Sequence, residues 1–136
     1  MPWRRTHDPY RILVSEVMLH QTQVARVIPK YHLFLDHFPD VNALSVAPQN
    51  KLLEIWQGLG YWRRALFLRR AAKIIVSELN GSFPSESATL QRLPGVGPYT
   101  ASAIACFAFG STEAFLDTNI RRVYLHFFFQ DVTDVH

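Results

Sequence analysis

Residues 93–101 constrain the fold of this chain more than any other stretch. Their sequence is Leu-Pro-Gly-Val-Gly-Pro-Tyr-Thr-Ala, a glycine-rich turn between two apolar segments. Residues 85–93 predict a short helix before the turn, and residues 99–109, rich in Ala, Ile and Phe, predict a buried helix after it. Pro98 suits the first turn of the second helix, where its missing N–H has no intrahelical partner to lose.

The turn itself is a candidate anion-binding site. Gly95 and Gly97 can adopt positive φ and let another backbone approach closely. Free N–H groups at the N-terminus of the second helix attract an anion. This is the helix-hairpin-helix pattern, whose usual anion is a DNA phosphate. The full nine-residue string favours DNA over a tight turn that binds nothing.

Length and composition fit one small domain, or two lobes that share a cleft. The chain has 136 residues, of which 49% are hydrophobic, and a formal net charge of +3, which permits nucleic-acid binding without proving it. Its one cysteine, Cys106, lies in an apolar run and is expected to be a buried thiol. One cysteine allows no disulfide framework, which suits a reducing cytoplasm. We find no signal peptide and no apolar run of about 18 residues, so we expect no membrane span.

Capping residues and helix breakers divide the chain into helical segments, and no convincing alternating strand occurs, so we expect an all-α fold. Gly58-Leu59-Gly60 predicts a turn. The expected helices are 9–19 with Asp8 as N-cap, 22–38 capped by Thr22, 40–46 capped by Asp40, 48–57, 61–79 ended by Asn80-Gly81, 85–93, 99–109, and one from Asp117 to about residue 129.

Glu16 is a candidate general acid. A helical wheel over residues 9–20 places it in an apolar stripe on the same side as His20, whereas Arg11 and Ser15 mark the expected solvent side. A buried carboxyl group has its pKa raised by desolvation, which suits an acid near neutral pH. The structural alternative is a carboxylate that pairs with Arg or His, or that reaches water.

Asp117 is a candidate persistent anion. It precedes residues 118–123 and can cap the helix expected there, which alone would explain it. Helix N–H groups also favour the ionised form, so the pKa values of Glu16 and Asp117 are expected to move in opposite directions. An acid and an anion together break a glycosidic bond through an oxocarbenium-like state.

Four motifs carry a resemblance to a known family. They are residues 15–24 (Ser-Glu-Val-Met-Leu-His-Gln-Thr-Gln-Val), 58–61 (Gly-Leu-Gly-Tyr), the hairpin string and 116–123 (Leu-Asp-Thr-Asn-Ile-Arg-Arg-Val). Together they resemble the MutY-type A/G-specific adenine DNA glycosylases of the HhH-GPD (endonuclease III) superfamily. The resemblance implies a two-lobed helical fold, incomplete at both ends, in a domain over 1–136, with the hairpin at 87–107, a six-helix lobe at about 9–110, and the rest of the second lobe from 1–8 and 117–136.

The activity that the resemblance implies is base-excision repair of double-stranded DNA. Adenine mispaired with 8-oxoguanine or guanine would be flipped into a cleft and removed. By similarity, Glu16 would protonate an adenine ring nitrogen. Asp117 would stabilise the oxocarbenium ion, either as a neighbouring anion or through a transient covalent adduct, before water attacks. Tyr99 would make an active-site hydrogen bond, and Asn119 would position the water or the carboxylates.

The resemblance also assigns DNA contacts. Trp3, Gln21 and Thr22 match base-pocket residues, and Tyr61 matches an aromatic wedge inserted beside the lesion. Hairpin N–H groups would hold a phosphate, often with a monovalent cation, at Gly95, Val96 and Gly97. The ordinary alternatives are core packing for Trp3 and Tyr99 and helix-start packing for Tyr61.

Basic residues crowd the helix expected over residues 61–79. Arg63 and Arg64 begin the group, which continues with Arg69, Arg70 and Lys73. They form either a solvated face or a set of phosphate contacts, and such contacts would be independent of base sequence and sensitive to salt.

Tyr99 bears on the reaction subtype. In endonuclease III-like enzymes this hairpin position holds a lysine that forms a Schiff base and cleaves the strand, which tyrosine cannot do. The resemblance therefore implies a monofunctional glycosylase. Tyr99 also fits a G/T-mismatch thymine DNA glycosylase, whereas Glu16 in its Ser-Glu-Val-Met-Leu context favours adenine.

The sequence departs from the family pattern at His20, where glutamine is common, at Trp62, where a second tyrosine is common, and at Thr118, where glycine is common. The family's four-cysteine [4Fe-4S] site and its 8-oxoguanine-reading region are expected only in a longer parent of this chain, and no cofactor is expected here. A bacterial-type, nucleoid-associated cytoplasmic monomer is expected. The rival classes are a non-catalytic DNA-binding fragment and a protein–protein module.

Overall fold

The computed structural model describes residues 6–111, which form seven α-helices and no β-strand. In chain order these are α1 (Pro9–Leu19), α2 (Val24–His37), α3 (Val41–Ser45), α4 (Gln49–Trp56), α5 (Arg63–Glu78), α6 (Ser87–Leu90) and α7 (Pro98–Phe109). The all-α prediction is confirmed for this range, and none of these helices has the length and apolar character needed to cross a membrane. The helix expected from residue 117 lies outside the described residues.

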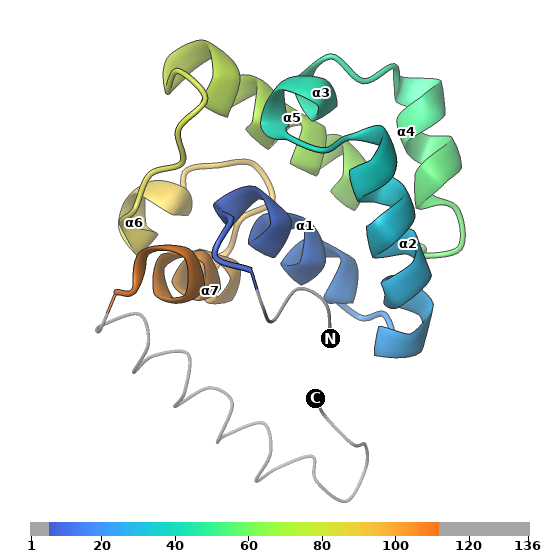
Figure 1. Cartoon of the computed structure of the whole chain (residues 1–136), viewed down its shortest axis with the longest axis horizontal. Coiled ribbons are helices and arrows are strands. Elements are labelled where there is room, and N and C mark those ends of the chain that lie inside the picture. Colours follow the sequence, from blue (N-terminus) through green and yellow to red (C-terminus); the bar gives the residue numbers. More distant parts are fainter. Residues whose placement is uncertain (1–5, 112–136) are drawn as a thin grey trace, which may run out of the picture.

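Helix α1 lies at the centre of the fold, with α7 packed on one side and α2 and α5 on others (Figure 1). Residues 12–18 are all buried as a result. The burial includes Ser15, which is 1% exposed and donates its hydroxyl proton to the carbonyl of Ile12 at 2.9 Å. The prediction that Ser15 faces solvent is wrong, because the wheel of one helix does not reveal a second packing partner.

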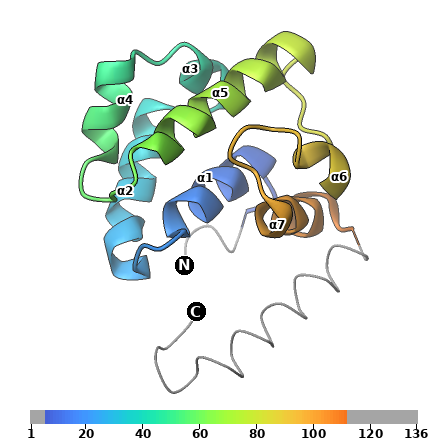
Figure 2. The ribbon, with the colours of Figure 1, turned by 180° about the vertical axis from the view of Figure 1, so that it is seen from behind.

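The helices beside α1 form two groups, α2–α5 and the hairpin helices α6–α7, and α1 lies between them (Figure 2). In the first group, Phe34 and Trp56 meet edge to face with ring centroids 6.0 Å apart, and both rings are buried. Tyr10 fastens α1 to the end of α2, because its hydroxyl donates to the carbonyl of Phe38 at 2.6 Å. Burial raises the pKa of Tyr10, so the phenol keeps the proton that it donates.

Two of the predicted N-caps are confirmed. The Asp8 carboxylate accepts a hydrogen bond from the backbone N–H of Tyr10 at 2.9 Å at the start of α1. Asp40 accepts from the N–H of Ala43 at 2.8 Å at the start of α3. Both caps act within three residues, which is why the sequence alone predicts them.

The predicted cap at Thr22 is wrong. Helix α2 begins at Val24, with Gln23 in the N-cap position. The Thr22 hydroxyl lies 3.3 Å from the carbonyl oxygens of both His20 and Leu59 and donates to them. A tertiary contact with a distant turn therefore takes the hydroxyl that a local cap would have used.

The turn at residues 58–60 is confirmed, and it extends one residue further than expected. Tyr61 has a φ of +49°, which lies outside the helical region, so α5 begins at Arg63. The predicted stop of this helix is confirmed by Asn80, with a φ of +54°, and Gly81, with a φ of +81°. Of the hairpin helices, α6 covers only the middle of residues 85–93, whereas α7 begins at Pro98, next to its expected start.

We expect Tyr10→Phe to lower the free energy of unfolding by about 1–2 kcal/mol, because the buried carbonyl of Phe38 loses its donor. Urea unfolding followed by circular dichroism measures the loss. The control is Tyr61→Phe, at a side chain that is 62% exposed. Equal stability of Tyr10→Phe and the parent chain would contradict the assigned role of this bond.

Candidate active site and nucleic-acid interface

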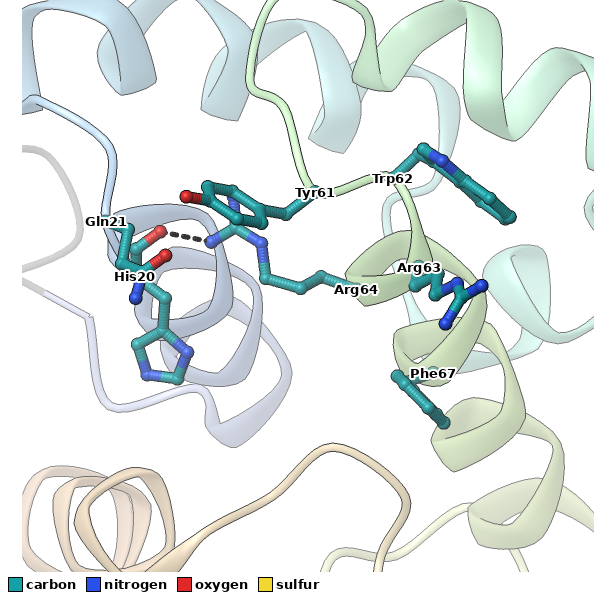
Figure 3. A pocket seen from close by; sticks show the side chains of 7 residues that line it. All are labelled: His20, Gln21, Tyr61, Trp62, Arg63, Arg64 and Phe67. Atoms are coloured by element: carbon teal, nitrogen blue, oxygen red, sulfur yellow. Dashed lines mark hydrogen bonds between the residues drawn. The ribbon is translucent and has the colours of Figure 1, made fainter.

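An open pocket of about 660 Å³ lies where the C-terminal end of α1 faces the start of α5 (Figure 3). The lining residues come from two short stretches and the first turns of α5, and they are His20, Gln21, Tyr61, Trp62, Arg63, Arg64 and Phe67. Gln21, predicted for the base pocket, and Tyr61, the predicted wedge, thus line the same pocket. Three of the lining aromatics are well exposed, namely Tyr61 at 62%, Trp62 at 52% and Phe67 at 40%.

Glu16 lies on α1 one helical turn before His20, a residue of the pocket lining. Its side chain is 8% exposed and lies in a helix whose neighbouring residues are buried. The structure therefore places Glu16 in the apolar stripe that the sequence predicts. Its role as an acid stays a prediction.

His20 connects the pocket to the hairpin. Its Nε2 lies 3.3 Å from the hydroxyl oxygen of Thr100, in the first turn of α7. Burial lowers the pKa of His20 below its ordinary value, and the positive charge of Arg64 lowers it further. A neutral imidazole therefore faces the pocket at neutral pH.

Arg63 and Arg64 differ in what they contact, although they are neighbours in sequence. The exposed Arg63 guanidinium lies 5.6 Å from the centre of the Trp62 ring. The Arg64 guanidinium is half-buried and donates to backbone carbonyls, including that of Val17 at 2.6 Å. Phosphate contact by Arg64 stays a prediction, and it would compete with these bonds. Arg69 also has protein partners, since it donates to the carbonyl of Ala47 at 3.0 Å.

The hairpin turn packs against α5 through Gly95. Its φ is +77°, and a Cβ built there would lie only 2.9 Å from the Cβ of Phe67. A small cavity of about 30 Å³ marks the place where hairpin, α1 and α5 meet, and residues of all three line it, among them Leu13, Phe67 and Gly95. The glycine is thus required both by conformation and by space.

The hairpin N–H groups are not equivalent. The N–H of Val96 donates to the carbonyl of Leu93 at 3.1 Å within the turn, and the Val96 side chain is 6% exposed. Gly97 is the N-cap of α7 with a φ of −88°, so it does not use the positive φ that we expected. Tyr99 is half-buried in the first turn of the helix. The N-terminus of α7 remains the predicted phosphate position, with Gly97 exposed beside it.

Sequence reasoning did not single out Phe67. It lies four residues after Arg63, so both side chains project from the same face of α5 toward the pocket. The signal in the sequence was the four-residue spacing of an apolar residue, Phe67, from a basic one, Arg63, which places both on one helix face. The expected solvated face of α5 is therefore partly aromatic.

The sequence profile of "HhH-GPD superfamily base excision DNA repair protein" matches residues 14–134. The chain belongs to this superfamily. Its match covers all of the described site, from Glu16 on α1 through the hairpin helices.

The chain is also similar to adenine DNA glycosylases. This HhH-GPD chain is 42% identical over 94% of its length to the adenine DNA glycosylase of Buchnera aphidicola, of which it covers 36%. It is 42% identical over 90% of its length to the human adenine DNA glycosylase, of which it covers 24%. The chain thus spans well under half the length of these relatives.

Solved structures share the fold. A thermostable thymine-DNA glycosylase has a TM-score of 0.77 and 31% identity, over 82% of this chain and 52% of that one. A trapped endonuclease III–DNA covalent intermediate has a TM-score of 0.71 and 24% identity, over 76% of this chain and 49% of that one, which speaks for the fold alone.

Three predicted site residues, Trp3, Asp117 and Asn119, lie outside the described residues. The four-cysteine iron–sulfur site that the resemblance implies does not fit this chain, whose one cysteine, Cys106, is buried in α7. Within residues 6–111, no three histidine, cysteine or acidic side chains gather as metal ligands would.

We expect Gly95→Ala to destabilise this HhH-GPD fold by about 1–3 kcal/mol, because the new methyl group meets Phe67 and the residue keeps a positive φ. Gly97→Ala is the matched control, since its φ is −88° and nothing lies within 4 Å of the place that its new methyl group would take. Thermal unfolding compares the two variants. Equal loss of stability in both would contradict the hairpin packing described above.

We expect stability to fall as pH drops below about 6.5, the ordinary pKa of histidine, because the unfolded chain then binds a proton that folded His20 resists. The loss grows until the pH reaches the lowered folded pKa. His20→Gln removes this contribution, so its unfolding midpoint should change less than that of the parent between about pH 7.5 and pH 5.5. A larger change in His20→Gln would contradict the assigned burial of the imidazole.

Proposed function

We propose that this chain is the catalytic region of a monofunctional DNA glycosylase that removes adenine mispaired with 8-oxoguanine or guanine. The observation that carries the proposal is its identity of 42–44% to adenine DNA glycosylases from Buchnera, Mycolicibacterium smegmatis and human over at least 90% of its length. The position of Glu16 supports it, because a buried carboxyl group lies one turn from an open, aromatic-lined pocket.

In the proposed reaction, adenine leaves the duplex and enters the pocket region beside α1. Eversion costs a few kcal/mol, and least at a mismatch, which helps the protein to select its target. Glu16 gives a proton to an adenine ring nitrogen, so the base departs as a neutral molecule and takes the electron pair of the glycosidic bond. Asp117 then faces the oxocarbenium ion until water attacks, with Asn119 positioning the water or the carboxylates.

The DNA partner is held by charge and by aromatic contact. The N-terminus of α7 offers its N–H groups and the positive end of its dipole to a backbone phosphate, with a monovalent cation beside it. Tyr61 supplies an exposed ring that can stack between bases. The exposed Arg63, whose guanidinium lies over the Trp62 ring, supplies a positive charge on the same side of the pocket. Mismatched or damaged double-stranded DNA is therefore the proposed partner.

Tyr99 supports the monofunctional subtype. It lies in the first turn of α7, where the endonuclease III-like enzymes carry their Schiff-base lysine. A phenol cannot form an imine with the sugar, so we propose base removal without strand cleavage.

A second candidate function is removal of thymine from G·T mismatches. A solved thymine-DNA glycosylase is 31% identical to this chain, and Tyr99 fits that group as well. Adenine remains the first proposal, since protonation by Glu16 has a clear task at a purine nitrogen. We further propose that the protein acts as a monomer in the cytoplasm, and that an iron–sulfur cluster belongs to residues beyond those of this chain.

The test is single-turnover base release from two duplexes, one with an A·8-oxoguanine pair and one with a G·T pair. We expect adenine release by the parent chain, and a loss of about 10²-fold or more in Glu16→Gln with binding to the mismatch retained. Glu78→Gln, at an exposed position near the end of α5, is the matched control and should release adenine at the parent rate.

Three results would contradict the proposal in different ways. Release of thymine alone assigns the chain to the second candidate. Equal adenine release by Glu16→Gln removes the proposed acid. Tight binding to both duplexes without release of either base by the parent identifies a DNA-binding fragment.

A further inference from the structure

We propose that Arg64 is a positioning residue that locks the C-terminal end of α1 to the turn carrying Tyr61, so that Gln21 and Tyr61 meet DNA in a preformed arrangement. This inference rests on the proposed function for its purpose. The lock itself rests on contacts within this chain.

The guanidinium of Arg64 bridges two segments that lie about forty residues apart. Its Nη1 donates to the carbonyl oxygens of Val17, at 2.6 Å, and His20, the bond drawn in Figure 3. Its Nη2 donates to the carbonyls of Leu59 and Gly60, both at 3.4 Å. One planar group thus satisfies carbonyls at the end of α1 and in the turn before α5.

Thr22 closes the same bridge from the other side. Its hydroxyl oxygen accepts from Nη2 of Arg64 at 3.3 Å and donates to the carbonyls of His20 and Leu59 at the same distance. The arginine and the threonine therefore form one network that spans both segments. Removing either member leaves the other with fewer partners.

The two segments hold backbone conformations that need such support. Gln21 has a φ of +58° and Tyr61 a φ of +49°. Besides them, Asn80 alone among the non-glycine residues in the described range has a positive φ. Such conformations persist where surrounding contacts determine them. Gln21 directly follows one acceptor of Arg64, and Tyr61 directly follows another.

Arg64 also packs against the ring of Tyr61, the proposed wedge. Its guanidinium carbon lies 5.2 Å from the centre of the Tyr61 ring and 5.7 Å from that of Trp56. The indole N–H of Trp56 in turn donates to the carbonyl of Gly60 at 3.1 Å. The exposed phenol ring therefore rests on a cation that is itself fixed to the core.

Within the described part of the chain, no carboxylate compensates the charge of Arg64. Both ion pairs found among residues 6–111 lie elsewhere, between Arg11 and Asp8 and between Lys51 and Glu54. The hydrogen-bond partners of Arg64 are neutral oxygens, so the wall of the pocket stays positive and attracts phosphate. The same charge contributes to the lowered pKa of His20.

A lysine cannot replace this arrangement, because one ammonium group does not present a planar fork to acceptors on two segments. A preformed wedge lowers the entropy lost on binding, so loss of the fork should affect base eversion more than general DNA affinity. If Arg64 acted through its charge alone, lysine would preserve both base eversion and DNA affinity. A loss of eversion with affinity retained therefore indicates a positioning role.

The test compares Arg64→Lys with Arg26→Lys, a control at an exposed position of α2. Hydrogen–deuterium exchange of the full chain should rise about tenfold in Arg64→Lys over residues 19–23 and 58–62, and stay unchanged in the core of α2 and α5. With 2-aminopurine as the target base opposite 8-oxoguanine, the fluorescence increase on binding should fall about tenfold, while affinity for a matched duplex stays within about twofold.

Unchanged exchange in both segments would overturn the proposal, as would raised exchange with a fluorescence increase equal to that of the parent. If Arg64→Lys fails to fold, Thr22→Val replaces it, and raised exchange in the same two segments is again the expected result. If the parent chain produces no fluorescence increase on any duplex, the proposed function fails, and the exchange measurement still decides whether Arg64 locks the two segments.

Discussion

The burial of α1 on several sides is the constraint on which the rest of the structure depends. α7, α2 and α5 all pack against this helix, so residues 12–18 have little access to water. Burying polar groups costs free energy unless they are hydrogen-bonded, and Glu16 lies within this segment. The packing thus fixes a carboxyl group on a rigid element, one turn from the pocket, as the proposed acid catalysis would require.

The C-terminal end of α1 is connected to both α5 and the hairpin by hydrogen bonds. The carbonyl of Val17 accepts from the N–H of the C-cap residue His20, and Arg64 of α5 donates to this carbonyl and to that of His20 as well. His20 reaches across to Thr100 at the start of α7, so the same helix end contacts both neighbouring groups. His20 and Phe67 line both the pocket and the small cavity beside the hairpin, so the predicted wedge and the predicted phosphate site adjoin the same residues.

Local sequence signals predicted most of the helices. Prediction failed at residues whose role is set by tertiary contacts. Asp8 and Asp40 act on residues next to them in sequence, so their caps follow from the chain alone. Ser15, Thr22 and Arg64 have roles set by partners that no periodicity or spacing reveals. For the site, motif resemblance singled out Gln21 after α1 and Tyr61 before α5, and these two residues line one pocket. It did not find Phe67, because the family's motifs end before the second turn of α5.

The most direct test of the account is a structure of the chain bound to a duplex that carries 2′-fluoro-2′-deoxyadenosine opposite 8-oxoguanine, since the fluorine slows departure of the base. The account predicts an everted adenine with a ring nitrogen about 3 Å from the Glu16 carboxyl group, the Tyr61 ring in the base stack, and a phosphate at the N-terminus of α7. An adenine that stays stacked in the duplex, with α1 turned away from the DNA, would contradict it.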